Sequence, residues 1–255
     1  MTDLKSTQQP KKFKVLLIGD ACIDIYRYGL VDRISPEAPV PVFKFTHEET
    51  RPGMVKNVQK NLENLGCEVI CLFGNSSEKT RLIDARSSQH VLRLDHDVIS
   101  QPLTIERVDE YLTEDLDAVV VSDYNKGFVS YTLVKDLRDS FDGPIFVDTK
   151  KDDLEYFEGC FVKVNSHEYA DATSVCTDLI VTQGAEGATY KKKTYPATSV
   201  QVVDVCGAGD TFLAALTAEY LNTNNIDAAI EFANRASAIT VSHVGVYAPT
   251  LEEIK

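Results

Sequence analysis

A glycine-rich turn with two acids, Asp204 to Phe212 (DVCGAGDTF), is the segment of this chain best suited to chemistry. An apolar run at 200–203 precedes it, and a helix-period run over 212–221 follows it. Glycines at a helix start let backbone N–H groups approach an anion, and the helix dipole favours negative charge there. A carboxylate such as Asp210 would repel a passively bound phosphate, but it suits a base that takes a proton from an attacking hydroxyl. The motif predicts a phosphoryl-transfer centre, and an ordinary strand–helix turn is the alternative for so short a motif.

The bulk composition favours one α/β domain over a nucleic-acid or membrane protein. The chain has 255 residues, of which 44% are apolar, so it can bury a full core. A net charge of −13 argues against nucleic acid or an anionic membrane as the main partner. No apolar run approaches the roughly 18 residues of a membrane span, and the polar segment 1–12 is expected to be a frayed leader rather than a signal peptide. Six cysteines without a CxxC pair fit a reduced, cytoplasmic protein.

Short apolar runs alternate with helix-period segments along the chain. We expect buried strands at 15–18, 69–73, 118–121, 145–147, 161–164 and 179–181, a hairpin over 187–196, and edge-strand pairs within 26–46 and 80–97. We expect helices that open at Gly53, Thr104 and Ser130, and two more over 207–221 and 226–242. This alternation predicts a mainly parallel sheet with helices on both faces.

Polar residues collect where the expected strands end. Ligands of parallel α/β sheets bind beyond the carboxyl ends of the strands. Six strand ends carry such residues: 19–24, 122–127, 148–150, 165–168, 182–184 and 204–210. Stability alone does not explain this concentration, so we expect these segments to form one site.

These segments resemble the ribokinase-like carbohydrate kinases over nearly the whole chain. The turn at 204–212 looks like the C-terminal signature of that family. Within the family, the chain is most similar to the D-glycero-D-manno-heptose 7-phosphate kinases. The strings that carry this likeness are 19–24, 33–42 (RISPEAPVPV), 51–53, 92–95 and 122–127, of which SPEAPVPV is the most distinctive.

The resemblance implies a single domain over 1–255 with a three-layer α/β/α fold, a mainly parallel central sheet and a small β-sheet lid built within about 22–50 and 80–97. It also implies a role for individual residues. Asp210 would be the base, and Gly207, Ala208 and Gly209 would supply the N–H groups of an anion hole. The sugar would be held by Asp24, Gly53, Asn57 and Lys126. The nucleotide would contact Thr182, Gly184, Gly187, Asn234 and Lys150, and Mg²⁺ would be organised by Asn165 and Glu168, partly through water.

The implied reaction is ATP- and Mg²⁺-dependent phosphorylation of a sugar phosphate, the anomeric hydroxyl of D-glycero-β-D-manno-heptose 7-phosphate. Some relatives also bind a monovalent cation near the anion hole, and a homodimer through the lid is implied. Two alternatives stay open: a kinase for another sugar such as ribose or fructose, and a catalytically weak relative that binds sugar phosphate or nucleotide.

The chain departs from the family pattern at three places. Met54 stands where the family usually has a second glycine after Gly53. After Phe73-Gly74 the chain passes almost directly to the strand expected at 79–85, where relatives carry a further helix and strand. A helix between Glu168 and Leu179 is missing or reduced. We therefore expect a shortened form of the fold with apolar surface that a partner subunit could cover.

Overall fold

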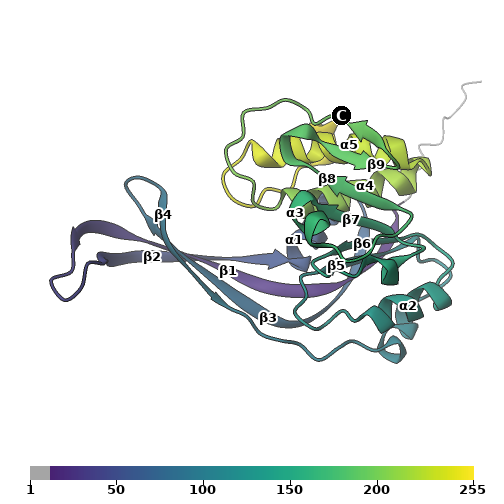
Figure 1. The fold of residues 1–255 in the computed structure, drawn as a ribbon, viewed down its shortest axis with the longest axis horizontal. Coiled ribbons are helices and arrows are strands. Elements are labelled where there is room, and N and C mark those ends of the chain that lie inside the picture. Colours follow the sequence, from purple (N-terminus) through teal and green to yellow (C-terminus); the bar gives the residue numbers. More distant parts are fainter. Residues whose placement is uncertain (1–11) are drawn as a thin grey trace, which may run out of the picture.

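The computed structural model describes residues 12–255, and the leader expected at 1–12 lies outside them apart from its last residue. One ten-stranded sheet organises this part of the chain (Figure 1). Its order is β10-β9-β8-β7-β6-β5-β1-β3-β4, with β2 paired to β1. The strands that build its parallel centre are β1 (Lys14–Ile34), β3 (Glu68–Asp84), β5 (Ala118–Asp123), β6 (Ile145–Thr149), β7 (Phe161–Asn165) and β8 (Leu179–Thr182). The predicted mainly parallel sheet is confirmed, and its carboxyl ends share one edge.

Helices cover both faces of this centre. On one face, α1 (Val55–Asn64), α4 (Ala208–Thr223), α5 (Ile226–Val241) and the short α6 (Leu251–Ile254) pack on β1 and β5 around Leu17, Phe146 and Leu213. On the other face, α2 (Tyr131–Ser140) and the 3₁₀ turn η3 (Leu154–Phe157) enclose a second core around Val121, Leu137 and Phe157. Ser130 begins α2 as expected, since its hydroxyl accepts a hydrogen bond from the N–H of Leu133 at 3.1 Å. The predicted three layers are therefore present.

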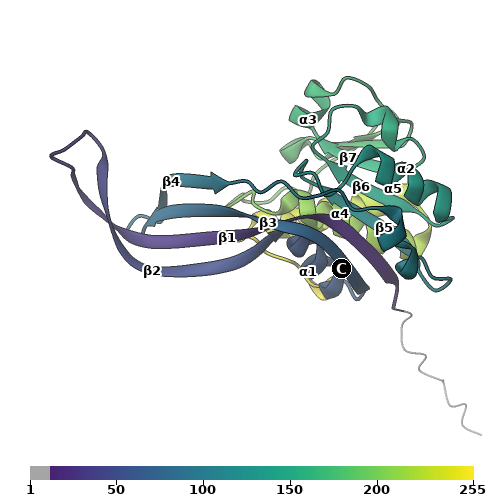
Figure 2. The same cartoon turned by 90° about the horizontal axis from the view of Figure 1, so that it is seen from below.

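The lid is a continuation of the same sheet. Residues 15–19 of β1 pair with β5, but from Ala21 onward β1 pairs with the antiparallel strand β2 (Pro41–Met54) instead. Strand β3 follows β1 in parallel through both regions and also pairs with β4 (Gln89–His96) in the outer half. The result is a single-layer blade that projects from the helix-covered body (Figures 1 and 2). The outer parts of β1–β4 overlap the ranges 22–50 and 80–97 expected for the lid, and those bounds stay a prediction.

The shortened segments have a direct structural counterpart. Strand β3 is continuous from Glu68 to Asp84 and passes from the core into the lid without an intervening helix. Between Glu168 and Leu179 the helix α3 (Ser166–Asp171) has only six residues. The hairpin expected over 187–196 is formed by β9 (Ala188–Tyr190) and β10 (Lys193–Tyr195) after the 3₁₀ turn η4 (Gly184–Glu186).

The helix predicted to open at Thr104 is wrong. The segment instead forms two separate 3₁₀ turns, η1 (Ile105–Arg107) and η2 (Asp109–Tyr111). Thr104 makes no side-chain cap, and the segment is held at its start by the N–H of Leu103, which donates to the carbonyl of Phe128. Its backbone hydrogen bonds join residues three apart, as from the N–H of Val108 to the carbonyl of Ile105 and from that of Tyr111 to Val108, which closes the tighter 3₁₀ turns.

Candidate active site

Asp210 lies in the first turn of α4 and is held by residues from two other elements. The side-chain amide of Asn57, in α1, donates to Oδ2 at 2.8 Å, and the hydroxyl of Tyr124, just after β5, donates to Oδ1 at 2.8 Å. The carboxyl group is buried, with 6% of the residue exposed. Burial raises its pKa to about 6, although both hydrogen bonds act in the opposite direction. A carboxylate with this pKa is suited to accept a proton near neutral pH.

A polar network fixes α1 against α4 and so fixes the position of Asp210. The amide nitrogen of Asn61 donates to the backbone carbonyl of Asn57 at 2.8 Å. Its amide oxygen accepts from the hydroxyl of Thr211 at 2.9 Å, and Thr240 of α5 donates to Thr211 at 3.0 Å. Because these buried groups are paired across three helices, the carboxyl group next to them has little freedom to rotate.

The turn before α4 has room only for glycine. Gly207 has φ of 79°, and a Cβ there would lie 2.7 Å from Val246 and 2.8 Å from the amide of Asn57. Asp204 orients the turn, because its two carboxylate oxygens accept from the N–H groups of Cys206 and Gly245, each at 2.9 Å. The N–H groups of the first helical turn have no helical acceptor and lie at the positive end of the helix dipole. The N–H of Ala208 donates to the carbonyl of Val205 at 3.3 Å, and we call Gly207–Gly209 the anion-hole turn after its predicted role.

The predicted sugar-side residues meet at the base of the lid. A carboxylate oxygen of Asp24 lies 2.2 Å from where a Cβ on Gly53 would be, so only glycine allows this approach. Asp24 is buried and pairs with Arg81 of β3 at 2.5 Å. The next residue, Met54, has φ of 55° and ψ of −127°, a conformation that costs a non-glycine residue about 1–3 kcal/mol. The departure at Met54 is therefore strained as well as bulky.

The two lysines predicted in the site, Lys126 on the sugar side and Lys150 on the nucleotide side, are both engaged in ion pairs. Lys126 pairs with Asp97 at 2.6 Å, which directs it to the loop that follows β4. Lys150 pairs with Glu168, and burial lowers the pKa of its ammonium group. Of the two, Lys150 belongs to the group of charges around Asp210, since Asp148 and Asp210 both act on its pKa.

Asn165 and Glu168 form a capping box at the start of α3. The side-chain oxygen of Asn165 accepts from the N–H groups of His167 and Glu168, and Glu168 accepts from the N–H of Asn165 at 2.7 Å. The motif thus has a structural role that explains both residues without a metal. The Glu168 side chain is only 12% exposed and faces Lys150. Mg²⁺ keeps much of its water and is bound by one or two carboxylates and by phosphate, so this arrangement fits a cation that is held mainly through water.

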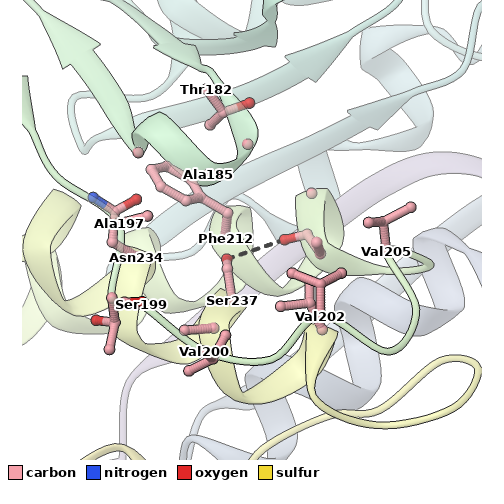
Figure 3. A pocket seen from close by; sticks show the side chains of 17 residues that line it. Thr182, Ala185, Ala197, Ser199, Val200, Val202, Val205, Phe212, Asn234 and Ser237 are labelled. Carbon is pink, nitrogen blue, oxygen red and sulfur yellow. Dashed lines mark hydrogen bonds between the residues drawn. The ribbon is translucent and has the colours of Figure 1, made fainter.

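A cavity of about 330 Å³ lies between η4, the loop before α4 and helix α5 (Figure 3). Four predicted nucleotide residues line it: Thr182, Gly184, Gly187 and Asn234. Ala208 and Gly209 line its inner end, so the cavity leads to the anion-hole turn. The amide of Asn234 donates to the carbonyls of Tyr195 and Pro196, which fixes the loop on that side. Lys150 is absent from the lining.

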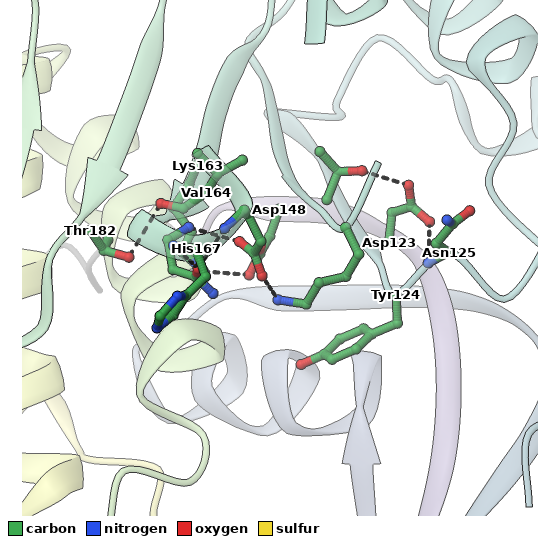
Figure 4. Close-up of polar contacts among 12 residues, drawn as sticks. Asp123, Tyr124, Asn125, Asp148, Lys163, Val164, His167 and Thr182 are labelled. Atoms are coloured by element: carbon green, nitrogen blue, oxygen red, sulfur yellow. Dashed lines mark hydrogen bonds and ion pairs between the residues drawn. The ribbon is translucent and has the colours of Figure 1, made fainter. Parts of the chain in front are cut away.

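The sequence reasoning missed several residues of this region. The apolar run at 200–203 is a loop whose exposed Val200 and Val202 line the cavity. Arg81 pairs with Asp24, Tyr124 with Asp210, and Lys163 with Asp148. Figure 4 shows Lys163 and Asp148 together. A charged residue inside the apolar strand FVKVN was the one sequence signal for Lys163. The partner of Arg81 lies 57 residues away, so no local pattern indicates it.

The fold and the site define the class of ribokinase-like α/β proteins. A ribokinase from Thermotoga maritima superimposes with a TM-score of 0.72 at 17% identity, over 95% of this chain and 98% of that one. An Arabidopsis thaliana ribokinase complexed with ribose and ATP gives 0.71 at 13% identity, over 96% and 98%. At these identities the likeness establishes the fold.

Sequence comparison places the chain within this class. A profile described as "pfkB family carbohydrate kinase" matches residues 160–254. The "Bifunctional protein HldE" of Marinomonas sp. (strain MWYL1) is 31% identical over 94% of this chain and 62% of its own length, and that of Helicobacter pylori (strain ATCC 700392 / 26695) is 30% identical over 94% and 66%. Residues 160–254 thus match the pfkB family of carbohydrate kinases, and 94% of the chain aligns with the HldE proteins.

Two features of these alignments bear on the chain itself. It spans less than two thirds of the length of these curated relatives. The alignment with the Marinomonas protein runs over 298 positions, more than the 255 residues of this chain, so the relative carries residues that this chain lacks. That agrees with the uninterrupted β3 and the short α3. No helix within residues 12–255 is long and apolar enough to cross a membrane.

Proposed function

We propose that this chain is an ATP-dependent sugar kinase that phosphorylates the anomeric hydroxyl of D-glycero-β-D-manno-heptose 7-phosphate. The observation that carries the proposal is the buried Asp210, held by Asn57 and Tyr124 at the anion-hole turn, with a cavity on one side and the lid base on the other. The resemblance of residues 33–42 and 122–127 to heptose 7-phosphate kinases supports the choice of sugar, as does the similarity to the HldE proteins.

The geometry supports a direct, in-line transfer. The sugar, held near Asp24 and Gly53, presents its hydroxyl to Asp210, which takes the proton as the oxygen attacks the γ-phosphorus. A new bond forms between the sugar oxygen and the phosphorus. The bond to the bridging oxygen of ATP breaks, and its electron pair leaves with ADP. The N–H groups of Gly207, Ala208 and Gly209 stabilise the negative charge spread over the transferring group.

The nucleotide and its metal complete the proposal. The base and ribose of ATP would occupy the cavity lined by Thr182, Gly184, Gly187 and Asn234, which leads to the anion-hole turn. Asn165 and Glu168 would hold Mg²⁺ largely through water, with Lys150 beside them. When bound, Mg²⁺ neutralises charge on the phosphates. Lys126, which pairs with Asp97, would help to hold the sugar.

We further propose that the protein forms a homodimer through the lid. The face of the blade turned away from Asp24 carries Ile23, Leu92 and Leu94, which are 40–51% exposed. A single-layer sheet with exposed apolar side chains on one face is expected to bury that face against another subunit. Sedimentation of a Leu92→Glu/Leu94→Glu variant should show a monomer, whereas Val175→Glu, at an apolar residue of the body that is 58% exposed, should leave the dimer intact. A monomeric wild-type protein contradicts this part of the proposal.

A substrate panel tests the reaction. ADP release would be measured with D-glycero-β-D-manno-heptose 7-phosphate, ribose, fructose and fructose 6-phosphate, with Asp210→Asn as the matched inactive control. The heptose phosphate should give the highest kcat/KM. A strong preference for ribose overturns only the choice of sugar, and ATP binding without turnover on any sugar favours a binding protein. Repeating the panel with and without K⁺ tests for the monovalent cation that some relatives bind.

A further inference from the structure

Lys163 is a buried lysine in the middle of β7 whose ammonium group lies beneath the anion-hole turn. Only 2% of the residue is exposed. Its Nζ lies 2.7 Å from a carboxylate oxygen of Asp148, at the carboxyl end of the neighbouring strand β6. A Cβ built on Gly209 would come within 2.9 Å of the same Nζ. The ammonium group therefore lies close to the backbone that would bind the transferring phosphoryl group.

The ion pair with Asp148 leaves both partners incompletely satisfied. An ammonium group has three N–H donors, and within residues 12–255 Asp148 is the one acceptor that Lys163 reaches. The other carboxylate oxygen of Asp148 is also buried and has no hydrogen-bond partner among these residues. Burying charge in this way is costly unless further hydrogen bonds are formed. A pair that served stability alone would be better satisfied.

The other nearby lysine is already committed. Lys150 pairs with Glu168, next to the capping box of α3. Lys163 is held from below by Asp148, and Gly209 has no side chain to separate it from the turn. Asp210, Asp148 and Lys163 interact electrostatically, since both neighbours contribute to the pKa of Asp210. A phosphoryl group at the turn would therefore meet a fixed positive charge as well as the backbone N–H groups.

We propose that Lys163 is a further catalytic residue, a built-in cation that contacts the oxygens of the transferring phosphoryl group past Gly209, where no side chain intervenes. This inference rests on the proposed kinase function. Lys163 keeps its proton throughout and forms no covalent bond. Its contribution is to stabilise the negative charge that spreads over the phosphoryl oxygens during transfer, as cationic groups do in other phosphoryl-transfer sites. Asp148 holds the ammonium group in place when no phosphate is bound.

Kinetics of three variants test this role. Lys163→Met removes the charge, Asp148→Asn removes its partner, and the double variant leaves no unpaired buried charge. Lys135→Met, at an exposed lysine of α2, is the control. We expect Lys163→Met to lower kcat by about 10²–10³-fold, the effect of losing one oxyanion-stabilising group, with a much smaller change in either KM. The double variant should remain as slow.

Recovery of the double variant to within a few-fold of the wild-type kcat would overturn the proposal, because it would show that the pair only compensates buried charge. The double variant also serves if Lys163→Met alone fails to fold. Binding measurements separate this inference from the kinase proposal. If wild-type protein phosphorylates no sugar in the panel, calorimetry with ADP and aluminium fluoride, a mimic of the transferring phosphoryl group, still applies. Lys163→Met should weaken binding of ADP with aluminium fluoride at least tenfold and leave binding of ADP alone unchanged. Equal binding of ADP with aluminium fluoride by wild type and variant would contradict the proposed role of Lys163.

Discussion

The core and the lid are parts of one sheet, but their ion pairs differ in how far they are exposed to solvent. In the core, all six residues of β5 are buried, and the pair Lys163–Asp148 is 3% and 8% exposed at its side chains. In the lid, most residues of β4 are exposed, and the pair Arg93–Asp95 is 53% and 35% exposed. A buried pair is costly to break, whereas exposed pairs contribute about 0–1 kcal/mol. Under the proposed function, the core would therefore set the chemistry electrostatically, and the lid would act mainly by holding the sugar.

The largest effect should come from the core. Replacing Asp210 by Asn keeps the shape of the side chain but removes the base, so kcat should fall by about 10²–10⁴-fold while the KM values change little. Steady-state kinetics with the best sugar of the panel measures this. Wild-type kcat in the Asp210→Asn protein would remove Asp210 from the mechanism.

A lid substitution should give the complementary pattern. Arg81→Met leaves the buried Asp24 without its partner, so the KM for the sugar should rise about tenfold or more with a smaller change in kcat. Arg93→Met is the matched control, because its pair with Asp95 is exposed and should contribute little. If both variants behave alike, the buried Asp24–Arg81 pair has no special role in holding the sugar.

The pH dependence of kcat/KM tests the electrostatics of the core. The pKa of Asp210 is raised to about 6, chiefly by burial, and the base acts only when it is ionised. The rate should thus fall about tenfold per pH unit below 6 and level off above it. The same shift bears on folding: the stability that Asp210 contributes is full below its ordinary pKa and is lost as pH rises through about 6. Asp210→Asn should therefore gain stability relative to wild type as the pH is raised from 4 to 7, as measured by denaturant unfolding.

The smallest effect should arise where core and lid meet, at Met54. Met54→Ala and Met54→Gly both lose the buried side chain, but only glycine relieves the positive φ. The glycine variant should therefore be more stable than the alanine variant by about 1–3 kcal/mol. Equal unfolding free energies would show that the backbone at this position is unstrained.

The sequence predicted the core well because its signals are local. Apolar runs marked the buried strands, and Ser130 marked the start of α2 through its own side chain. It predicted the 3₁₀ region after Thr104 wrongly, since a short helical period does not reveal whether enough hydrogen bonds can form. The length of β1 was also underestimated. Its outer half lies in the lid, where buried and exposed residues alternate, so it does not form an apolar run.

The site was predictable where the residue is identified by its own motif. Asp210, Gly207 and Gly209 stand in one turn, of which Gly209 lines the cavity while Asp210 is held by Asn57. Lys163 and Arg81 could not be found in this way, because each owes its position to an acid on another strand. Asn165 and Glu168 show the converse case, since a capping box accounts for the same spacing that suggested a metal.

The uninterrupted strands β1 and β3 also have a mechanical consequence. A lid joined by flexible loops moves about hinges. Here the same two hydrogen-bonded strands form both the blade and the floor of the site. The blade can move only by bending or twisting that ribbon. A displacement of the tip of the blade, such as one caused by binding of a second subunit, would therefore shift β1 at Asp20 and Asp24, at the edge of the proposed site.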